Sequence, residues 1–428
     1  MKRYSQYKDS GVEWIGEIPK HWSISKLAWS LDFETGFTPS TKNNSYYDNG
    51  TNVWVTISDM NKKNIGTSKV KITDEAVEGR KIVPEGSLLY SFKLSVGKMA
   101  FTGCDLYTNE AIFAIKPTSN IILEYYYYLL GEILEFNSNE NIYGAKLLNQ
   151  ELIKASKILV PPVREQKAIA SHLDTKTEQI DHLIQLKERK IELLKEKRQA
   201  LINETVTKGL DPSVPMKDSG VEWIGEIPEH WGVKKMKYGL SLKTEKGEPM
   251  SDDIKISPEN VQSYTGVCNN MHSEYSGDGV IFEKGDILFN KLRLYLAKIW
   301  FATLSGYSMG EMIVLSPNKI TNGKYMFYQF FIQGFIDFLD AQSTGVKMPR
   351  VSPEVILNTL LCFPPSYEQE EIASYLNKQS KEIYSLIKDE KIKINLLKEY
   401  RQSLISEAVT GQIRVCEEDV SAHQTQNV

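Results

Sequence analysis

The feature that most constrains the fold of this chain is an internal repeat, in which two blocks of its sequence each occur twice. Residues 8–19, KDSGVEWIGEIP, recur unchanged as residues 217–228, and both copies run on to a His-Trp pair. A second block, residues 161–207, recurs without gaps as residues 364–410, with about half of its positions identical. Such a duplication predicts two halves built from the same structural units.

Between the shared blocks lie two segments that follow one outline but differ in sequence. Duplication that only enlarges a fold is one interpretation. Near-identical ends around divergent middles instead favour one constant mechanical role with two separate specificities. The expected division is a repeated N-terminal block (1–22), a first variable domain (23–160), a central helix (161–207), a linker with the second copy of the block (208–231), a second variable domain (232–363), a C-terminal helix (364–411) and a polar tail expected to be disordered (412–428).

The second repeated block predicts a long helix that pairs with its own copy. Residues 165–207 contain neither Pro nor Gly and are rich in good helix formers. Apolar residues recur in them at heptad spacing, which is typical of a coiled coil. The expected interface residues are Leu173, Ile180, Ile184, Ile191, Leu194 and Leu201 in the first copy, and Leu376, Ile383, Ile387, Ile394, Leu397 and Leu404 in the second.

Each apolar seam is interrupted by a charge. Lys187 and Glu390 occupy the same heptad position with opposite charges. If the helices pair within the chain, an ion pair there would favour this partner and this register, and two solvated charges are the alternative. The span from Leu173 to Leu201 corresponds to about 42 Å of helix at ~1.5 Å per residue, so the pair would act as a spacer.

The two variable segments predict small mixed α/β domains. Short stretches rich in β-branched and aromatic residues, bounded by Gly or Pro, are typical of strands. One helix-like stretch follows them in each half, at residues 123–135 and 324–339. The expected fold class is α+β, with two mixed α/β domains and two long paired helices.

Basic and polar residues gather at matching places in these domains. The candidate DNA-binding residues are Lys93, Ser95, Lys98 and Lys146 in the first domain, and Lys291, Arg293, Tyr295, Lys298, Lys347 and Arg350 in the second. Lys and Arg neutralise phosphates, and Arg, Lys, Asn and Ser can read base edges. A solvated loop charge is the alternative for any one of them. The whole chain has 51 Lys and Arg against 55 Asp and Glu, so its total charge does not indicate a generic polybasic nucleic-acid binder.

The sequence offers no credible catalytic or metal-binding constellation. Residues 306–310 fit the G-x-S-x-G pattern, but a strand is expected after the serine, where a nucleophile elbow needs a helix. The four cysteines are far apart with no C-x-x-C spacing, and no Walker A motif is present. His21 and His230 belong to the repeated corner and are expected to be structural. No secretory signal or membrane span is visible, so a cytoplasmic location is expected.

Two repeated motifs carry a family resemblance. The opening DSGVEWIGEIPxHW and the helix start PPxxEQxxIA, each present twice, resemble the specificity (S) subunits of type I restriction–modification systems, the HsdS family. The resemblance covers essentially the whole chain up to residue 412. It implies a non-catalytic DNA reader, with target recognition domains at residues 23–160 and 232–363.

The resemblance also implies the assembly in which the chain would act. The two long helices would form an antiparallel pair with pseudo-twofold symmetry and, with the N-terminal blocks, dock two modification (methyltransferase) subunits. Those subunits would bind S-adenosylmethionine and methylate adenine in double-stranded DNA, and restriction/translocase subunits would use ATP and Mg; no cofactor is expected in this chain. A spacer of about 42 Å matches roughly 12 base pairs at ~3.4 Å each, so the two domains would read two separate half-sites. Because the sequences of the two domains differ, this bipartite target is expected to be asymmetric.

Three alternatives stay open at this point. One is the recognition subunit of a related system that cuts on both sides of its bipartite site. Another is a coiled-coil scaffold that never touches DNA. The third is an enzyme that cuts or modifies DNA by itself, against which the missing catalytic motifs speak.

Overall fold

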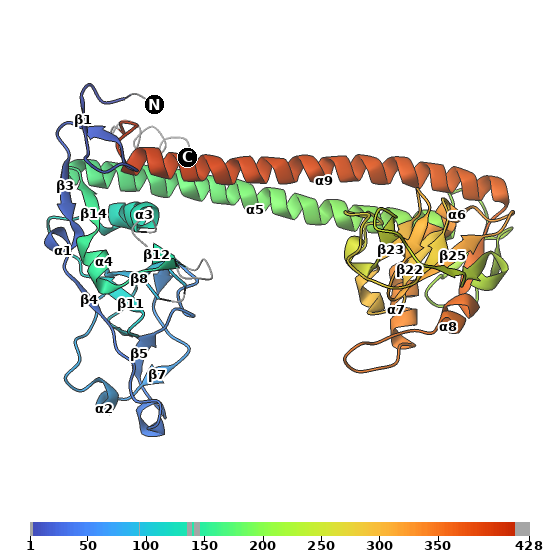
Figure 1. Ribbon diagram of the computed structural model, residues 1–428, viewed down its shortest axis with the longest axis horizontal. Coiled ribbons are helices and arrows are strands. Elements are labelled where there is room, and N and C mark those ends of the chain that lie inside the picture. Colours follow the sequence, from blue (N-terminus) through green and yellow to red (C-terminus); the bar gives the residue numbers. More distant parts are fainter. Residues whose placement is uncertain (1–2, 94, 135–138, 141–145, 416–428) are drawn as a thin grey trace. The chain divides into compact units, whose positions relative to one another are not determined.

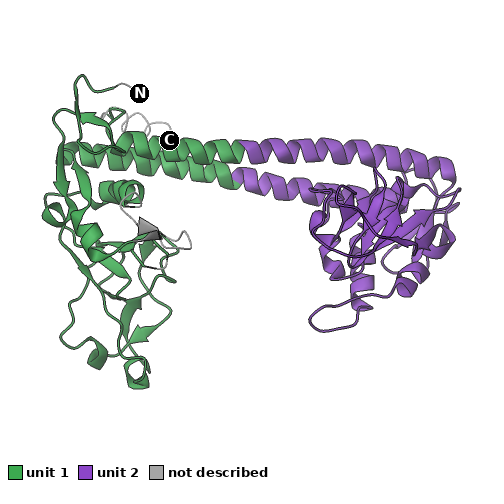
Figure 2. Ribbon diagram, viewed as in Figure 1, with its two compact units in different colours: residues 1–185, 393–428 green, residues 186–392 purple. Residues whose placement is uncertain are grey.

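The chain is organised in two compact units, each with its own sheets and its own stretch of two long helices. A computed structural model describes residues 3–93, 95–134, 139–140 and 146–415, without the side chains of 139–140 and 146–147. One unit comprises residues 1–185 and 393–428, and the other comprises residues 186–392 (Figure 2).

Two long helices run through the repeated blocks, as the heptad pattern predicts. Helix α5 spans Val163–Lys208 and helix α9 spans Ser366–Val409, and the two pack together (Figure 1). Helix α5 is followed by Gly209 with φ +78°, a left-handed conformation that commonly ends a helix. A side chain at that position would also lie 3.3 Å from the ring of Trp231.

The residues expected at the helix interface line the packed seam. Nine of the apolar ones are at most 8% exposed: Leu173, Ile180, Ile184, Ile191, Leu376, Ile383, Ile387, Ile394 and Leu404. Leu194, Leu201 and Leu397 are partly buried. Burial of a branched aliphatic side chain contributes about 1.5–3 kcal/mol, so this seam is a main source of the helix pair's stability.

The charged heptad position forms an ion pair within the second unit. Lys187 Nζ lies 3.0 Å from Glu390 Oε2, and Lys190 Nζ lies 3.0 Å from Glu390 Oε1. The carboxylate is buried, whereas both lysines reach solvent. A buried carboxylate needs such partners, so this site favours one alignment of the two helices over shifted ones.

In the first unit the variable domain holds two small sheets. The five-stranded sheet has the order β4-β11-β8-β9-β6, and the three-stranded sheet has the order β10-β5-β7. The strand bounds are β4 Phe33–Thr35, β5 Asn52–Val55, β6 Asn64–Ile65, β7 Lys71–Ile72, β8 Leu88–Ser91, β9 Met99–Thr102, β10 Tyr107–Thr108 and β11 Ile112–Ile115, with helices α1 Leu27–Ser30, α2 Asp74–Val77, α3 Leu123–Ile133 and α4 Gln150–Ala155.

The variable domain of the second unit also holds two sheets. Their orders are β18-β25-β22-β23 and β19-β21-β24-β20. The strand bounds are β18 Leu240–Lys243, β19 Lys246–Gly247, β20 Lys255–Ile256, β21 Gly279–Phe282, β22 Ile287–Asn290, β23 Ile299–Phe301, β24 Gly306–Ser308 and β25 Met312–Pro317, with helices α6 Gly323–Gln329, α7 Gln333–Ala341 and α8 Pro353–Asn358. Three-residue 3₁₀ helices occur at Asn44–Tyr46, Met236–Tyr238, Pro258–Asn260 and Leu294–Leu296.

Further short strand pairs lie within the repeated N-terminal blocks and between the two ends of each variable domain. In the first unit β1 (Tyr7–Asp9) pairs with β2 (Glu17–Pro19), and β3 (Ser23–Lys26) pairs with β14 (Lys157–Val160); in the second, β15 (Met216–Asp218) pairs with β16 (Glu226–Pro228), and β17 (Gly232–Lys235) pairs with β26 (Leu360–Phe363). A further short pair joins β12 (Asn139–Glu140) and β13 (Lys146–Leu147). In both halves the strand after the His-Trp pair is thus paired with the strand that leads into a long helix.

Two expectations from the sequence were wrong in detail. The single helix expected at residues 324–339 is broken into α6 and α7, and the intervening Phe330, Phe331 and Ile332 are all buried. One straight helix could not bury apolar side chains on every face, so the chain bends and packs both pieces. Residues 412–415, expected to begin a disordered tail, are described, and Gln412 Nε2 donates to Glu17 O over 2.7 Å. The rest of that tail lies outside the described residues.

Within the described part of the chain, no helix combines the length and the apolar character needed to cross a bilayer.

The buried ion pair yields a stability prediction. Lys187→Glu places a second carboxylate beside the buried Glu390, and we expect it to lower the free energy of unfolding by about 2–4 kcal/mol. The matched control is Lys195→Glu, which breaks the exposed pair with Glu192 and should change stability by less than about 1 kcal/mol. Urea denaturation of both variants checks this; equal effects would contradict a role for the buried pair.

Candidate nucleic-acid interface

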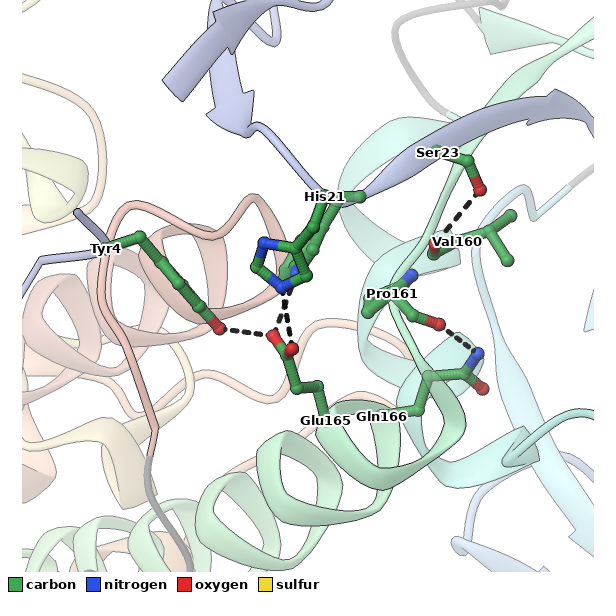
Figure 3. A network of polar contacts seen from close by, with 8 residues as sticks. Tyr4, His21, Ser23, Val160, Pro161, Glu165 and Gln166 are labelled. Atoms are coloured by element: carbon green, nitrogen blue, oxygen red, sulfur yellow. Dashed lines mark hydrogen bonds and ion pairs between the residues drawn. The ribbon is translucent and has the colours of Figure 1, made fainter. Parts of the chain in front are cut away.

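A glutamate in the first turn of each long helix binds the histidine and the tryptophan of the repeated corner through its carboxylate. In the first unit, Tyr4 OH, His21 Nε2 and Trp22 Nε1 lie 2.7, 2.7 and 2.9 Å from the carboxylate oxygens of Glu165 (Figure 3). Glu165 lies in the first turn of α5, where the helix dipole favours a negative charge. The corner is therefore held by hydrogen bonds to a charged acceptor, the strongest kind available.

The second unit repeats the histidine and tryptophan contacts of this arrangement. His230 Nε2 lies 2.6 Å from Glu368 Oε1, and Trp231 Nε1 donates to Glu368 Oε2 over 2.8 Å. Both indole rings are almost fully buried. Both histidines thus bind a helix carboxylate at the corner of the fold, which agrees with the structural role expected for them.

The pKa values of the two carboxyl groups are also shifted from their ordinary value. Burial would raise the pKa of Glu165, but the hydrogen bonds from Trp22, Tyr4 and His21 outweigh it and lower that pKa below its ordinary value. The pKa of Glu368 is lowered in the same way, with burial opposed by the bonds from Trp231 and His230. Each corner is therefore strongest when its glutamate is ionised.

The glutamine after each of these glutamates ties the helix start to the variable domain. Gln166 Nε2 donates to Pro161 O over 2.8 Å, and Gln166 Oε1 accepts from Ile122 N just before α3. Gln369 makes the same pair of bonds, to Pro364 O and from Asn322 N just before α6. Both side chains are buried. The repeated Glu-Gln dipeptide thus joins three parts of each half, a role that its spacing in the sequence did not reveal.

Polar heptad positions provide a second attachment, and this one differs between the halves. In the first unit, Tyr128 OH donates to Asp174 Oδ1 over 2.6 Å and lies 3.1 Å from Thr177 Oγ1. In the second unit, buried Arg198 donates to Tyr264 O over 2.9 Å. The guanidinium carbon of Arg198 also lies 5.0 Å from the ring centre of Tyr384, within cation–π range. Polar residues in the seam are therefore used to orient the domains.

In the first domain the candidate loop joins β8 to β9. Lys93 and Ser95 are exposed, and Lys93 Nζ lies 5.6 Å from the ring centre of Phe92. Lys98 is half-buried, and its Nζ lies 3.4 Å from both Ile57 O and Asn61 Oδ1. Lys93 and Ser95 are thus the members of this set that solvent and DNA can reach most readily. The side chain of Lys146, in β13, lies outside the described part of the structure.

In the second domain the structure brings two candidate loops together. Arg293 N donates to Pro349 O over 2.9 Å, and Val351 N donates to Lys291 O over 3.1 Å. Arg293, Tyr295, Lys347 and Arg350 are exposed, whereas Lys291 and Lys298 are partly buried. Lys298 Nζ donates to Pro258 O over 2.7 Å, much as Lys98 is bound to a neighbouring loop in the first domain. These two loops therefore form one cationic surface.

An acidic residue that the sequence interpretation missed lies within this surface. Glu311 is 2.6 Å from Arg350 Nη2 and 3.4 Å from Lys291 Nζ. The matching Glu110 accepts a hydrogen bond from Thr38, which is the main cause that lowers its pKa; partial burial opposes this, and Lys93 adds a smaller lowering. The only sequence signal for this acidic residue was that a glutamate precedes the corresponding strand in both halves, at residues 312–317 in the second.

The serine of the G-x-S-x-G pattern is buried in a strand. Ser308 lies in β24 and its Oγ donates to Met312 O over 3.0 Å. The expected strand follows it as β25. Over the described ranges, no group of three or more His, Cys, Asp or Glu side chains is arranged to hold a metal ion.

Comparison with known proteins gives a consistent result. The family model described as "Type I restriction modification DNA specificity domain" matches residues 19–196 and 256–396. The type I restriction enzyme MjaIX specificity subunit of Methanocaldococcus jannaschii is 25% identical, over 94% of this chain and 95% of that protein. The type I restriction enzyme EcoDI specificity subunit of Escherichia coli is 21% identical, over 93% and 90%.

Solved structures share the fold. A chain from "Structural basis underlying complex assembly and conformational transition of the type I R-M system" matches with a TM-score of 0.70 at 14% identity, covering 92% of this chain and 99% of that one. The HsdS subunit from Thermoanaerobacter tengcongensis matches with a TM-score of 0.54 at 15% identity, covering 92% and 98%.

The lowered pKa of Glu165 predicts a pH-dependent contribution to stability. Glu165→Gln should lower the free energy of unfolding at pH 7 by about 1–2 kcal/mol, a modest figure because 25% of the side chain is exposed. A depressed folded-state pKa stabilises above the ordinary value of 4.5, and this stabilisation is lost as pH falls through the folded value. The difference in the free energy of unfolding between wild type and variant should therefore shrink at low pH.

Denaturant titrations at pH 7 and at low pH measure this gap. The matched control is Glu178→Gln, on an exposed position of the same helix, which should change little at either pH. A gap between wild type and Glu165→Gln that widens in acid would show that the carboxylate is not stabilising in its ionised form.

Proposed function

The chain belongs to the type I restriction modification DNA specificity domain family, and from this premise we propose that it is a specificity subunit that reads DNA for a restriction–modification complex. Its two target recognition domains, residues 23–160 and 232–363, would each read one half of a bipartite target. The halves of that target would differ, because the candidate loops carry different residues in the two domains.

One observation carries this proposal. The Glu-Gln dipeptide that ties each helix start to its variable domain is the same in both halves, Glu165 and Gln166 in one and Glu368 and Gln369 in the other. The exposed loop residues at matching places differ, for example Ser95 and Arg293. Identical attachment with divergent exposed loops is what a device with two separate specificities requires.

The exposed loops carry the chemistry that DNA recognition needs. Lys93, Lys347 and Arg293 are exposed cations that suit phosphate oxygens, and an arginine can also bind the O6 and N7 atoms of guanine in the major groove. The chain as a whole has a net charge of −4, so partner subunits would supply a large share of the backbone contacts.

In this proposal catalysis belongs to partner subunits. Two modification subunits would bind S-adenosylmethionine and methylate adenine, and restriction/translocase subunits would use ATP and Mg, while this chain contributes recognition alone in the cytoplasm. Exposed apolar residues on the long helices support docking of such partners, because large apolar side chains on a helix surface favour association. They include Leu183, Leu186, Leu193, Leu386 and Leu396, each between 45% and 58% exposed.

A domain exchange tests the reader role. Residues 23–160 are replaced by the corresponding domain of a divergent relative, and adenine methylation is mapped across the host genome with and without the exchange. We expect a bipartite motif in which only one half changes. The reciprocal exchange of residues 232–363 is the control and should change the other half. A methylated motif that changes with neither exchange, although the modification partner is bound, would overturn the proposal.

Single cations test the assignment within the loops. In the complex with modification subunits, Lys347→Ala should weaken DNA binding for all sequences and reduce the slope of log affinity against log salt by about one. Arg293→Ala should instead relax the preference at one base pair, at a cost of about 1–3 kcal/mol. Lys319→Ala, which alters an exposed lysine outside the candidate loops, in the turn before α6, is the control and should leave both quantities unchanged. A salt slope unaltered by Lys347→Ala would remove it from the interface.

A further inference from the structure

Two exposed apolar side chains of the second domain lie at the tip of a loop between α7 and α8. Val346 is fully exposed and Met348 is 52% exposed, with the exposed Lys347 between them. This connection projects from the domain in Figure 1, beside the labels of those two helices. Contact with an apolar group of a partner would remove the surface of these two side chains from water, which is favourable in free energy.

The tip is held rigidly by the residues at its base. Thr344 and Arg350 exchange two backbone hydrogen bonds, of 2.8 and 2.9 Å. Gly345 has φ +102°, and a side chain there would meet Met348 O at 3.1 Å, so the turn closes tightly only with glycine. A loop already ordered before binding loses little conformational entropy when a partner engages it.

The charges around the tip define what kind of partner fits. Arg350 and Lys291 are paired with Glu311 at the base of the loop, which fixes the base and cancels one of its two positive charges. Farther out, Lys347 and Arg293 are exposed, and Arg293 is joined to the loop through its bond to Pro349 O. An apolar tip flanked by cations complements a groove in DNA, where phosphates line the rims and base edges form the floor.

We propose that Val346 and Met348 contact thymine methyl groups in the major groove of the half-site read by residues 232–363, an inference that rests on the proposed function. The loop is two backbone segments wide, which suits the major groove of about 12 Å better than the minor groove of about 6 Å. The C5-methyl of thymine is the apolar group that base edges present there. The tip would thus read T·A pairs by apolar contact, beside Lys347, which would bind a phosphate.

The test removes the partner methyl group from the DNA. The half-site is taken from the methylation map, and each thymine in it is replaced in turn by uracil, which keeps every hydrogen-bonding group and lacks only the methyl. Affinity is measured for the complex of the full chain with its modification subunits. We expect at least one replacement to weaken binding about fourfold, the effect of one buried methyl-sized group. If no uracil replacement in this half-site weakens binding, the proposal is overturned.

A variant then links the penalty to this loop. In the Val346→Ala/Met348→Ala protein the uracil penalty should fall to near onefold, because the side chains that sense the methyl are gone. Ile320→Ala removes a comparably exposed apolar side chain, 70% exposed, from the turn before α6 and should keep the full penalty. A penalty that is equal in wild type and in the double variant would assign methyl recognition elsewhere.

These outcomes separate failure of this inference from failure of the proposed function. A complex that prefers its target over scrambled DNA but shows no loop-dependent penalty retains the reader role and loses only the methyl contact. A complex without any sequence preference counts against both. Because both altered side chains are exposed, thermal unfolding of the double variant should match wild type, and that measurement confirms that altered binding reflects a lost contact.

Discussion

The other parts of each half depend on one interaction, the hydrogen bonding of the repeated corner to a carboxylate in the first turn of the long helix. Glu165 and Glu368 receive the histidine and tryptophan of the repeated corner, and the buried glutamine that follows each of them binds the entry to the helix of the variable domain. Hydrogen bonds to an ionised acceptor are strong and directional, and leaving such partners unmatched is costly. This explains physically how one attachment can hold two domains whose own sequences have diverged.

With the attachment held constant, the loops at the ends of the sheets can vary without loss of the fold. The cores of both domains are closed by strand pairing and apolar packing, which the exposed residues of the β8–β9 and β22–β23 loops do not enter. Not every lysine in these loops is available, however. Lys98 and Lys298 bind carbonyl groups of neighbouring loops, so one cation in each domain is committed to the scaffold, and the exposed cations beside it are the candidates for DNA recognition. The second domain adds Glu311, which cancels one of the two positive charges at the base of a cationic surface and leaves Arg293 and Lys347 exposed.

How far the sequence could predict the structure differs from element to element. The helices of residues 163–208 and 366–409 and their seam were predictable, because heptad spacing acts through contacts that repeat along one element. The break between α6 and α7 was not, because the helix-like apolar pattern of residues 324–339 continues through Phe330 and Phe331, and their burial is decided by packing against distant residues. Likewise the loops at residues 291–298 and 345–350 were expected separately, and only the fold joins them through Arg293 and Pro349.

The sequence by itself determined the duplication, the paired helices, the two variable domains and the family, because repeats and periodicity are properties of the linear chain. Tertiary structure alone decided which charges are committed to the scaffold, which polar seam residues hold the domains, and which side chains stand at an exposed tip. Exposure and partnership depend on residues far apart in sequence, such as Arg350 with Glu311 or Arg198 with Tyr264. No local pattern encodes those distances, so only the folded arrangement separates a cation that can meet DNA from one already bound within the protein.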